Sequence, residues 1–508
     1  MLRKYPIGLQ SFREIRGGGY VYIDKTEIIH QLVENGQYYF LSRPRRFGKS
    51  LLVDTIEELF SGSRELFENL WVHDRWDWTK INPVIHFDFA ELPYKEVGLS
   101  EAINRGIARN AEKLGIEISG DNIKDCFREL IEKASVKGQV VILIDEYDKP
   151  IIDFLDEPEL LDANRAIMKN FYSVLKDSDK HIRLLLITGV SQFSRVSVFS
   201  DLNNLRNITL VPQYGGLVGI TQQELEENFS QEITEMQKSR PDILARIKDW
   251  YNGYTWDMQT WVYNPFSLLN FMAGPVFQNY WFETGTPTFL LSQLKRRAVY
   301  DVESLEMGSL ALSTFNTENP NPGSLLFQTG YLTIKNISSD GQLYELGYPN
   351  REVKASLLDG LLSIYREASW EDSLGLVAKI KKALNTCDIE GLVHQLNALI
   401  STIAYDHWKA DTESIFNIIT FLTFRLAGVD VYTEVHSARG RSDVLVKTDL
   451  YIYVIELKLD GTAAEALAQI KEKGYLQPYA ADPRKKIAVG ISFSSEKREA
   501  EEFLVAEQ

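Results

Sequence analysis

The chain has little cysteine and no long hydrophobic run, and each absence excludes a class of protein. Its 508 residues include two cysteines, Cys126 and Cys387, which lie far apart in the sequence. A disulfide framework and a paired-cysteine zinc site are therefore excluded, and the seven histidines form no H-x-x-H or H-x-x-x-H pair. No apolar run approaches the roughly 20 residues that cross a bilayer, and the N-terminus lacks the apolar core of a signal peptide. These absences predict a cytoplasmic protein without a membrane partner.

Composition and charge are those of a globular protein with several domains. Hydrophobic residues make up 44% of the chain and charged residues 25%, as in ordinary globular proteins. A length of 508 residues exceeds what one compact core holds. The formal net charge of −16 argues against a protein that coats nucleic acid non-specifically. It leaves room for a local basic groove.

Strand-like and helix-like stretches alternate over the first 220 residues. Continuous apolar runs at 38–44, 83–92, 139–148 and 183–191 predict strands, and residues 51–60 have the periodicity of a helix. Continuous apolar strands that alternate with helices are typical of a parallel sheet covered on both faces. The predicted fold class is therefore α/β.

The rest of the chain changes character three times. Residues 221–300 are polar and helical, which suits a lid over a nucleotide site. A hairpin and amphipathic helices follow and form a linker region, and the last stretch has the order α-β-β-β-α-β with a final strand at 485–493. The predicted domains are 1–220, 221–300, 301–400 and 401–508.

The segment RPRRFGKS contains the second half of the phosphate-loop pattern G-x-x-x-x-G-K-[ST]. Its backbone N–H groups and the N-terminus of the following helix attract phosphate. Lys49 is expected on the β- and γ-phosphates, and the Ser50 hydroxyl on Mg²⁺. Arg43 occupies the place of the first glycine, while Arg45 and Arg46 add positive charge without an assigned role. The candidate nucleotide-binding residues are Arg46, Phe47, Gly48, Lys49, Ser50 and Leu51.

A buried strand, VVILID, ends in the acids Asp145 and Glu146. Asp145 is expected to hold Mg²⁺, and Glu146 to polarise the attacking water as general base, although two acids can also be plain solvated strand termini. No N-K-x-D motif is present, which favours ATP over GTP. Thr188, Ser191 and Arg195 follow another strand, where one of them senses the γ-phosphate or all of them cap the next helix.

Seven motifs are spread over the chain: GYVYIDKTEII, FLSRPRRFGKSLL, VILIDEYD, TGVSQFSRVSVFSDLNNL, WYNGY, YNPFSLL and GYLTI. With them the chain resembles, over almost its whole length, the bacterial AAA-ATPase-like proteins that carry a C-terminal PD-(D/E)XK nuclease-like domain. RPRRFGKS is that family's own form of the loop, so Arg43 fits the family pattern. The resemblance implies an AAA-like ATPase core that uses ATP and Mg²⁺. AAA-like modules often complete their sites across subunits, so the resemblance also allows a homo-oligomer.

Near the C-terminus, GRSDVLV and YVIELKL supply Asp443, Glu456 and Lys458. Glu456 and Lys458 are two apart in a strand, so they share a face, and Asp443 begins the neighbouring strand. One carboxylate from each strand can share a Mg²⁺ beside the lysine, which is what phosphodiester cleavage needs. The arrangement resembles the PD-(D/E)XK core with these three residues on its motif positions, and Ser442 stands where proline is usual. The alternative is an ordinary surface Glu–Lys pair.

Further residues accompany this constellation. Glu413, on the preceding helix, matches the auxiliary acid of the PD-(D/E)XK family. Gln469 and Tyr475 resemble its Q-x-x-x-x-x-Y pattern on the following helix. Glu434, on the strand before Asp443, could also face the metal. Glu413 and Gln469 therefore join the candidate catalytic residues.

Basic residues are few in this region. Residues 396–508 contain 13 Lys and Arg against 17 Asp and Glu, a net charge of −4 that is unfavourable for holding a polyanion. Arg439 and Arg441 are the candidate phosphate contacts, and the alternative for both is a solvated hairpin edge.

The sequence thus predicts an ATP-driven nuclease. ATP binding and hydrolysis in the N-terminal module would license Mg²⁺-dependent cleavage of DNA or RNA, and domain pairing suggests defence or mobile-element control. One alternative is an ATP-dependent switch whose nuclease-like domain only binds nucleic acid or a protein. Another is a signalling ATPase with no nucleic-acid role.

Overall fold

The chain folds into two compact units. The first comprises Met1–Thr284 and Val302–Val353, and the second comprises Gly285–Asp301 and Lys354–Gln508. The computed structural model describes residues 3–192, 199, 202–281, 288–297, 299–312, 321–366, 373–401, 412–428, 430–437 and 440–507. Within these ranges, no side chain is described at 288–289, 373–374, 412–417, 430, 433–437 and 440–443.

A five-stranded parallel sheet forms the centre of the N-terminal unit, with the strand order β2-β3-β4-β1-β5. All six residues of β3 are buried, as expected of a strand covered on both faces. The predicted parallel α/β architecture is confirmed. The strands are β1 (Tyr38–Ser42), β2 (Val84–Asp88), β3 (Val140–Asp145), β4 (Ile182–Gly189) and β5 (Arg206–Asn207).

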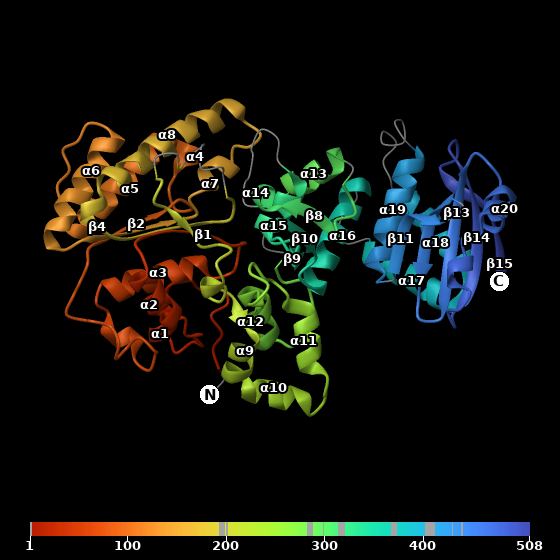
Figure 1. The fold of residues 1–508 in the computed structure, drawn as a ribbon, viewed down its shortest axis with the longest axis horizontal. Coiled ribbons are helices and arrows are strands. Elements are labelled where there is room, and N and C mark those ends of the chain that lie inside the picture. Colours follow the sequence, from red (N-terminus) through yellow and green to blue (C-terminus); the bar gives the residue numbers. More distant parts are fainter. Residues whose placement is uncertain are drawn as a thin grey trace. The chain divides into compact units, whose positions relative to one another are not determined.

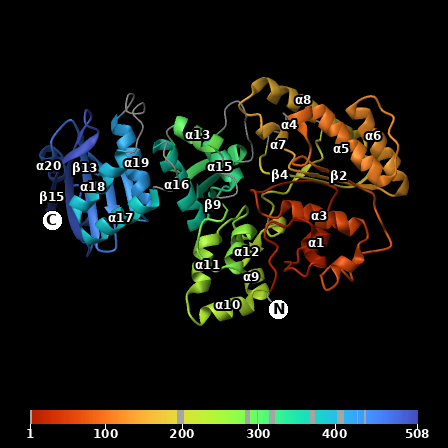
Figure 2. The ribbon, with the colours of Figure 1, turned by 180° about the vertical axis from the view of Figure 1, so that it is seen from behind.

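Helices cover both faces of this sheet (Figures 1 and 2). α1, α2 and α3 lie on one face, and α4 to α8 lie on the other. α6 shows why: it buries Phe127, Leu130, Ile131 and Ala134, one stripe at helical spacing. The helices are α1 (Phe12–Gly17), α2 (Thr26–Glu34), α3 (Lys49–Phe60), α4 (Tyr94–Val97), α5 (Leu99–Leu114), α6 (Ile123–Ala134), α7 (Lys149–Ile152) and α8 (Pro158–Asp177).

Two smaller substructures complete this unit. The first is helical, as predicted, and consists of α9 (Gln222–Asn228), α10 (Ser230–Gln237), α11 (Ile243–Tyr251) and α12 (Pro265–Ala273) beside the short pair β6 (Ile220–Thr221) and β7 (Val262–Tyr263). The second is an antiparallel sheet with the order β8-β10-β9. Its elements are β8 (Leu305–Gly308), α14 (Ser309–Leu312), α15 (Pro322–Thr329), β9 (Thr333–Ile337) and β10 (Leu343–Gly347). β9 and β10 form the predicted hairpin.

The C-terminal unit is built on a second sheet, of order β11-β12-β13-β14-β15, in which only the pair β13–β14 is parallel. Its strands are β11 (Asp430–Ser437), β12 (Gly440–Lys447), β13 (Tyr451–Leu459), β14 (Lys485–Ser494) and β15 (Glu499–Glu507). Its helices are α13 (Thr288–Arg296), α16 (Arg351–Arg366), α17 (Ser373–Thr386), α18 (Ile389–Ile400), α19 (Thr412–Leu426) and α20 (Ala463–Lys473). α16 begins in the N-terminal unit, because the boundary falls at residue 353.

The strand predicted at 485–493 is confirmed as β14, but the prediction that it is the last strand is wrong, because β15 follows it and pairs with it. β15 is an edge strand with one buried residue, Ala500, and its sequence EAEEFLVAE is rich in glutamate. Charged residues are common on edge strands, where they discourage pairing with other chains. This composition hides the apolar alternation from which strands are predicted.

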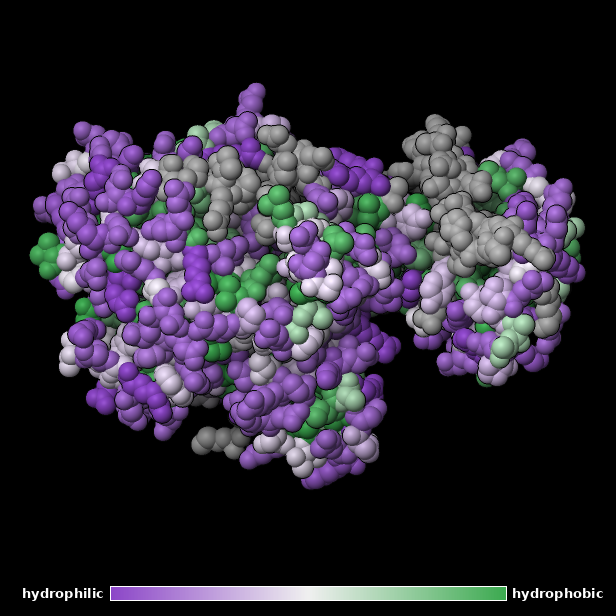
Figure 3. Space-filling view, in the orientation of Figure 1, coloured by the Kyte–Doolittle hydropathy of each residue, from purple (hydrophilic) through white to green (hydrophobic). Residues whose placement is uncertain are grey.

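The predicted linker region 301–400 is divided between the units, since residues 302–353 belong to the first and residues 354–400 to the second. The division into four domains stays a prediction. In the part of the chain that the structure describes, no helix is long and apolar enough to cross a bilayer. The surface seen in Figure 3 is mostly hydrophilic, with hydrophobic residues in small groups.

Candidate functional sites

The phosphate loop connects the carboxyl end of β1 to the N-terminus of α3. Gly48 has φ 93°, in the left-handed region that glycine adopts readily, and it turns the chain into the helix. No side chain caps α3 at this end. The first-turn N–H groups of α3 therefore have no partner from a capping side chain, which is the condition under which a helix N-terminus binds an anion.

Lys49 lies beneath this loop with only 6% of its surface exposed. Its Nζ donates hydrogen bonds to the carbonyl oxygens of Arg43 and Pro44, each at 3.0 Å. Burial lowers the pKa of Lys49, and three neighbouring carboxylates oppose this shift. These acids are Asp145, Glu146 and Asp148. Two of these acids, Asp145 and Glu146, are those that the sequence assigned to metal and water.

The two acids at the carboxyl end of β3 are held in different ways. Asp145 is 1% exposed, and the Thr188 hydroxyl on the neighbouring strand β4 donates to its Oδ1. Glu146 has φ 49°, which is uncommon for a residue other than glycine. Its Oε2 lies 3.4 Å from Lys149 Nζ. Asp145 is thus fixed within the sheet, while Glu146 is turned toward the loop side.

A cleft of about 360 Å³ opens beside the loop. Its polar lining includes Arg45, Arg46, Lys49, Ser50, Glu146 and Lys149. The structure therefore brings the predicted phosphate residues Lys49 and Ser50 to the same cleft as the predicted base Glu146. Four of these six side chains are cationic, which suits a polyphosphate.

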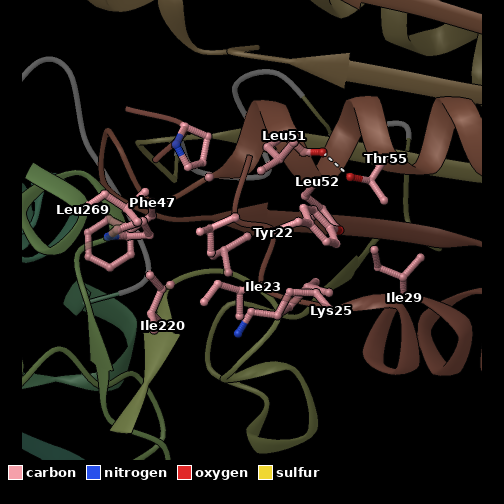
Figure 4. Close-up of a pocket in the computed structure, with 17 residues that line it drawn as sticks. Tyr22, Ile23, Lys25, Ile29, Phe47, Leu51, Leu52, Thr55, Ile220 and Leu269 are labelled. Atoms are coloured by element: carbon pink, nitrogen blue, oxygen red, sulfur yellow. Dashed lines mark hydrogen bonds between the residues drawn. The ribbon is translucent and has the colours of Figure 1, made fainter. Parts of the chain in front are cut away.

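An apolar pocket of about 90 Å³ adjoins this cleft (Figure 4). Tyr22 and Ile23 come from the segment before α2, Phe47 and Leu51 from the phosphate loop and α3, and Leu269 from α12. Its walls are almost wholly apolar, which is typical of pockets for flat ring systems. The cleft and the pocket share five lining residues: Pro6, Gly48, Leu51, Pro265 and Leu269.

Sequence reasoning assigned no role in binding to Tyr22, Ile23, Pro265 and Leu269. They belong to the motifs GYVYIDKTEII and YNPFSLL, which carried the family resemblance. Their only signal was membership of those motifs. They lie far from residues 43–50 in the sequence, and only the fold brings them to the loop.

Arg43 holds the phosphate loop in place and does not contact the cleft. It is fully buried, and its Nη1 donates to the carbonyl oxygens of Ser42 at 2.9 Å and Thr209 at 2.8 Å. Its guanidinium carbon lies 4.0 Å from the centre of the Trp256 ring, within the range of a cation–π contact. Arg43 therefore fixes the base of the loop to the turn before β7, and it does not line the phosphate cleft.

The other two loop arginines contact different elements. The Arg46 guanidinium lies 5.0 Å from the Phe266 ring of α12. The Arg45 carbonyl oxygen accepts a hydrogen bond of 3.2 Å from Trp281 Nε1. The Trp281 backbone N–H in turn donates to Glu352 at 2.8 Å. A chain of contacts thus runs from the phosphate loop to the first turn of α16.

The segment after β4 is held by Asp148, a buried acid that sequence reasoning did not single out. Asp148 Oδ2 accepts hydrogen bonds from the backbone N–H groups of Val190 at 3.1 Å and Ser191 at 2.6 Å. Burial raises the pKa of Asp148 to about 6. Of the three candidate γ-phosphate sensors, Thr188 binds Asp145 and Ser191 is buried. Arg195 lies outside the described residues.

In the C-terminal unit, Glu456 is 1% exposed on β13. The Gln469 Nε2 on α20 donates to Glu456 Oε1, and the Lys458 Nζ lies 3.6 Å from the same oxygen. The structure therefore brings together Glu456, Lys458 and Gln469. Tyr475 is buried in the core between α20 and the sheet, where it packs.

Backbone register places two further acidic positions in line with Glu456. Val444 pairs with Ile455, so one step along the antiparallel pair sets position 443 opposite 456. On the other side of β12, the pairs Thr433–Val444 and Val435–Ser442 set position 434 opposite 443. Positions 434, 443 and 456 thus form a row across β11, β12 and β13. We call these three positions the acidic row.

Several predicted side chains fall outside the described part of the chain. The structure does not describe the side chains of Glu413, Glu434, Arg441 and Asp443, nor any part of Arg439. Among the side chains that it does describe, no group of three His, Cys, Asp or Glu lies close enough to hold a metal ion. A magnesium ion bound with ATP does not require such a group, because phosphate and water oxygens supply most of its ligands.

The donor sets fit a hard cation at both places. At the phosphate loop, the Ser50 hydroxyl lines the cleft and the Asp145 carboxylate is buried and oriented by Thr188. At the C-terminal sheet, the acidic row presents carboxylate positions on neighbouring strands. Oxygen donors of this kind suit Mg²⁺.

Comparison with known proteins agrees with this geometry. Residues 6–199 match a family described as predicted AAA-ATPase, and residues 411–503 match the PD-(D/E)XK nuclease superfamily. A protein of Azotobacter chroococcum mcd 1, described as "Uncharacterized protein in vnfD 5'region", is 39% identical over 519 residues that cover 99% of each chain. No solved structure matches. The chain therefore belongs to the AAA-ATPase-like proteins with a C-terminal PD-(D/E)XK nuclease-like domain.

Proposed function

We propose that this chain hydrolyses ATP with Mg²⁺, and that its nucleotide state controls a metal-dependent nuclease that acts on DNA or RNA. The observation that carries the proposal is the cleft at the phosphate loop. It joins the uncapped N-terminus of α3 and the buried Lys49 to the acid Glu146. Domain pairing adds a role in defence or in control of mobile elements.

ATP fits the two adjoining cavities. The cationic cleft suits the triphosphate, and the apolar pocket beside it suits the adenine ring. Lys49 would exchange the carbonyl oxygens of Arg43 and Pro44 for phosphate oxygens. Ser50 and Asp145 would hold Mg²⁺, which supplies charge neutralisation at the phosphates.

Glu146 is the base in this proposal. Its carboxylate lines the cleft, so it can accept a proton from the water that attacks the γ-phosphate. Lys149, at 3.4 Å, holds that carboxylate near the loop. Thr188 keeps Asp145 oriented by donating to it. Each of these roles uses a contact that exists before nucleotide binds.

The acidic row supports the nuclease part. Asp443 and Glu456 would hold Mg²⁺, which lowers the pKa of a bound water and offsets charge on the phosphodiester. Lys458 lies beside Glu456 and is placed to stabilise the attacking nucleophile. Gln469 fixes the Glu456 carboxylate from α20. Glu413 and Glu434 are auxiliary acids in this proposal.

The nuclease part is tested by incubating the full chain with Mg²⁺ or Mn²⁺ and plasmid DNA or RNA, with and without ATP. Wild type is expected to cut, and Asp443→Ala and Lys458→Ala are expected to lose cutting. Glu472→Gln, an exposed acid on α20, is the matched control and keeps it. Absence of cutting by wild type under every condition, or equal cutting by the two variants, contradicts the nuclease.

The ATPase part has its own test. Glu146→Gln should bind ATP with unchanged affinity and lose about 100-fold or more of its turnover, because a general base contributes roughly that factor. The measurements are phosphate release and equilibrium binding of a fluorescent ATP analogue. Unchanged turnover would remove Glu146 from the role of base and leave the binding site intact.

A further inference from the structure

An exposed tyrosine on β11 is surrounded by cations. Tyr432 is 44% exposed, although it lies within a strand. The Arg425 guanidinium carbon lies 5.8 Å from its ring centre, and Lys447 Nζ lies 5.1 Å from it. Lys447 Nζ also lies 4.6 Å from the ring of Tyr479. These four residues are the tyrosine–cation patch.

The patch lies on the same face of the sheet as Glu456. Tyr432 pairs with Leu445, and Leu445 pairs with Val454, so the three share one face. Leu445 and Val454 belong to the core packed against α20. Glu456 is two residues beyond Val454 and is bonded to Gln469 of α20, so it faces the same way.

The patch is also close to the acidic row. Tyr432 lies two residues before position 434 on β11, which is about 7 Å along a strand. A ligand that crosses the acidic row on this face therefore reaches Tyr432 within the length of about one nucleotide step.

No ion pair is described for Lys447, and the side chain of Asp430, which pairs with Lys447 across β11 and β12, is not described. Within the part of the chain that the structure describes, no carboxylate lies within 4.0 Å of its Nζ. Two other lysines of this unit are paired with acids, since Lys485 lies 3.1 Å from Glu507 and Lys497 contacts Glu501. In a region of net charge −4, the patch gathers two cations at the exposed ring of Tyr432, and Tyr479 beside it is partly buried.

We propose that the tyrosine–cation patch binds single-stranded nucleic acid, with a base stacked on Tyr432 and phosphates on Lys447 and Arg425. The proposal rests on the proposed nuclease function and names its substrate class. Stacking on an aromatic side chain requires an open base face, which single-stranded nucleic acid has and a duplex does not. The Tyr432 ring is 44% exposed and has two cations 5.8 Å and 5.1 Å from its centre, so a base can stack on its open side while phosphates reach the cations.

The test measures binding without cleavage. The full chain in EDTA is titrated against fluorescent oligo-dT, oligo-U and duplex DNA of roughly 20 nucleotides, longer than one typical single-strand site. Tyr432→Ala is expected to weaken single-strand binding about tenfold, and Tyr432→Phe, which keeps the ring, to leave it nearly unchanged. Trp261→Ala removes an equally exposed aromatic of the N-terminal unit and is the matched control.

A second variant tests the cation. Lys447→Ala should weaken single-strand binding and reduce the salt dependence of binding by about one counterion. Lys485→Ala, which removes a lysine paired with Glu507, should change neither. Thermal melting of each variant establishes that the fold is kept, and Lys447→Ala supplies the decisive result if Tyr432→Ala does not fold.

The outcomes separate the patch from the nuclease. Loss of binding in Tyr432→Ala and Lys447→Ala supports the patch even if wild type cuts nothing, a result that overturns only the proposed function. Wild-type cutting together with unchanged binding by both variants overturns the patch and leaves the nuclease. Preferred binding of duplex DNA, independent of Tyr432, also overturns it. Equal loss with oligo-dT and oligo-U supports the patch without a sugar preference.

Discussion

The two candidate sites are assembled in opposite ways. The nucleotide site combines the loop at 43–50, the acids at the carboxyl end of β3, Thr188 on β4, the segment around Tyr22 and α12. These segments are separated by tens to hundreds of residues. The C-terminal site lies between positions 434 and 469, on three consecutive strands and the next helix. The nucleotide site is thus formed by residues that are distant in the sequence, whereas the C-terminal site is formed by residues that are near one another in the sequence.

This difference indicates which site senses a ligand and which site is controlled by it in the proposed function. A ligand that contacts several distant segments can favour a different arrangement of them, provided that it binds that arrangement more tightly. Lys49 contacts its own loop, Arg43 joins that loop to Trp256, and Trp281 joins it to Glu352 in the first turn of α16. A site made from three consecutive strands and the next helix has fewer such connections. The nucleotide site is therefore the sensing element in the proposed function, and the C-terminal site is the element that is controlled.

The largest effect is expected from the substitution that removes the Lys49 cation from the nucleotide site. Lys49→Ala should weaken ATP binding on the order of 1,000-fold, because it removes charge-assisted hydrogen bonds of about 1.5–3 kcal/mol each. Titration of a fluorescent ATP analogue measures this. Lys137→Ala, an exposed lysine of the same unit, is the control. Binding of ATP by Lys49→Ala with wild-type affinity would contradict the assignment of the loop.

A smaller effect concerns the buried acid behind that site. Burial raises the pKa of Asp148 from its ordinary 3.8 to about 6. Between pH 3.8 and about 6, Asp148 binds a proton in the folded state but not in the unfolded state. The free energy of unfolding is therefore higher at low pH, and this contribution is lost as the pH rises through about 6. Asp148→Asn keeps an acceptor for Val190 and Ser191 and does not titrate. Relative to this variant, wild type should lose on the order of 3 kcal/mol of unfolding free energy between pH 4 and 7.

Tryptophan fluorescence during denaturant unfolding follows this change, because seven of the nine tryptophans lie in the N-terminal unit. Asp88 and Asp359 also have pKa values raised to about 6, and their effects cancel because both proteins contain them. If the free energy of unfolding varied with pH in the same way for wild type and Asp148→Asn, Asp148 would not be the source of the pH dependence.

The smallest effect tests the local character of the C-terminal site. Thr462 and Glu465 form a capping box at the N-terminus of α20, the helix that carries Gln469. Thr462→Ala should cost about 1 kcal/mol, the usual value of such a cap. Hydrogen exchange should show faster opening of α20 amides, while ATP affinity stays unchanged. A matching loss of ATP affinity would mean that the two sites are not separate in the way described.

The sequence predicted what is local in both sites. Gly48, Lys49 and Ser50 are recognisable from spacing between a strand and a helix, and Glu456 and Lys458 share a face because they are two apart in a strand. The partners of Arg43 could not be predicted, because Thr209 and Trp256 lie more than 160 residues away. Asp148 stands three residues after Asp145, and nothing in its spacing indicates that it holds the segment after β4.

The central claim is that ATP at the N-terminal site controls cleavage at the C-terminal site. The most direct measurement is the rate at which the full chain cuts a single-stranded oligonucleotide with Mg²⁺, with and without ATP, for wild type, Lys49→Ala and Glu456→Ala. We predict an ATP-dependent rate for wild type, the same rate with and without ATP for Lys49→Ala, and no cutting by Glu456→Ala. A wild-type rate that ATP does not change, or ATP-dependent cutting by Lys49→Ala, would contradict the account.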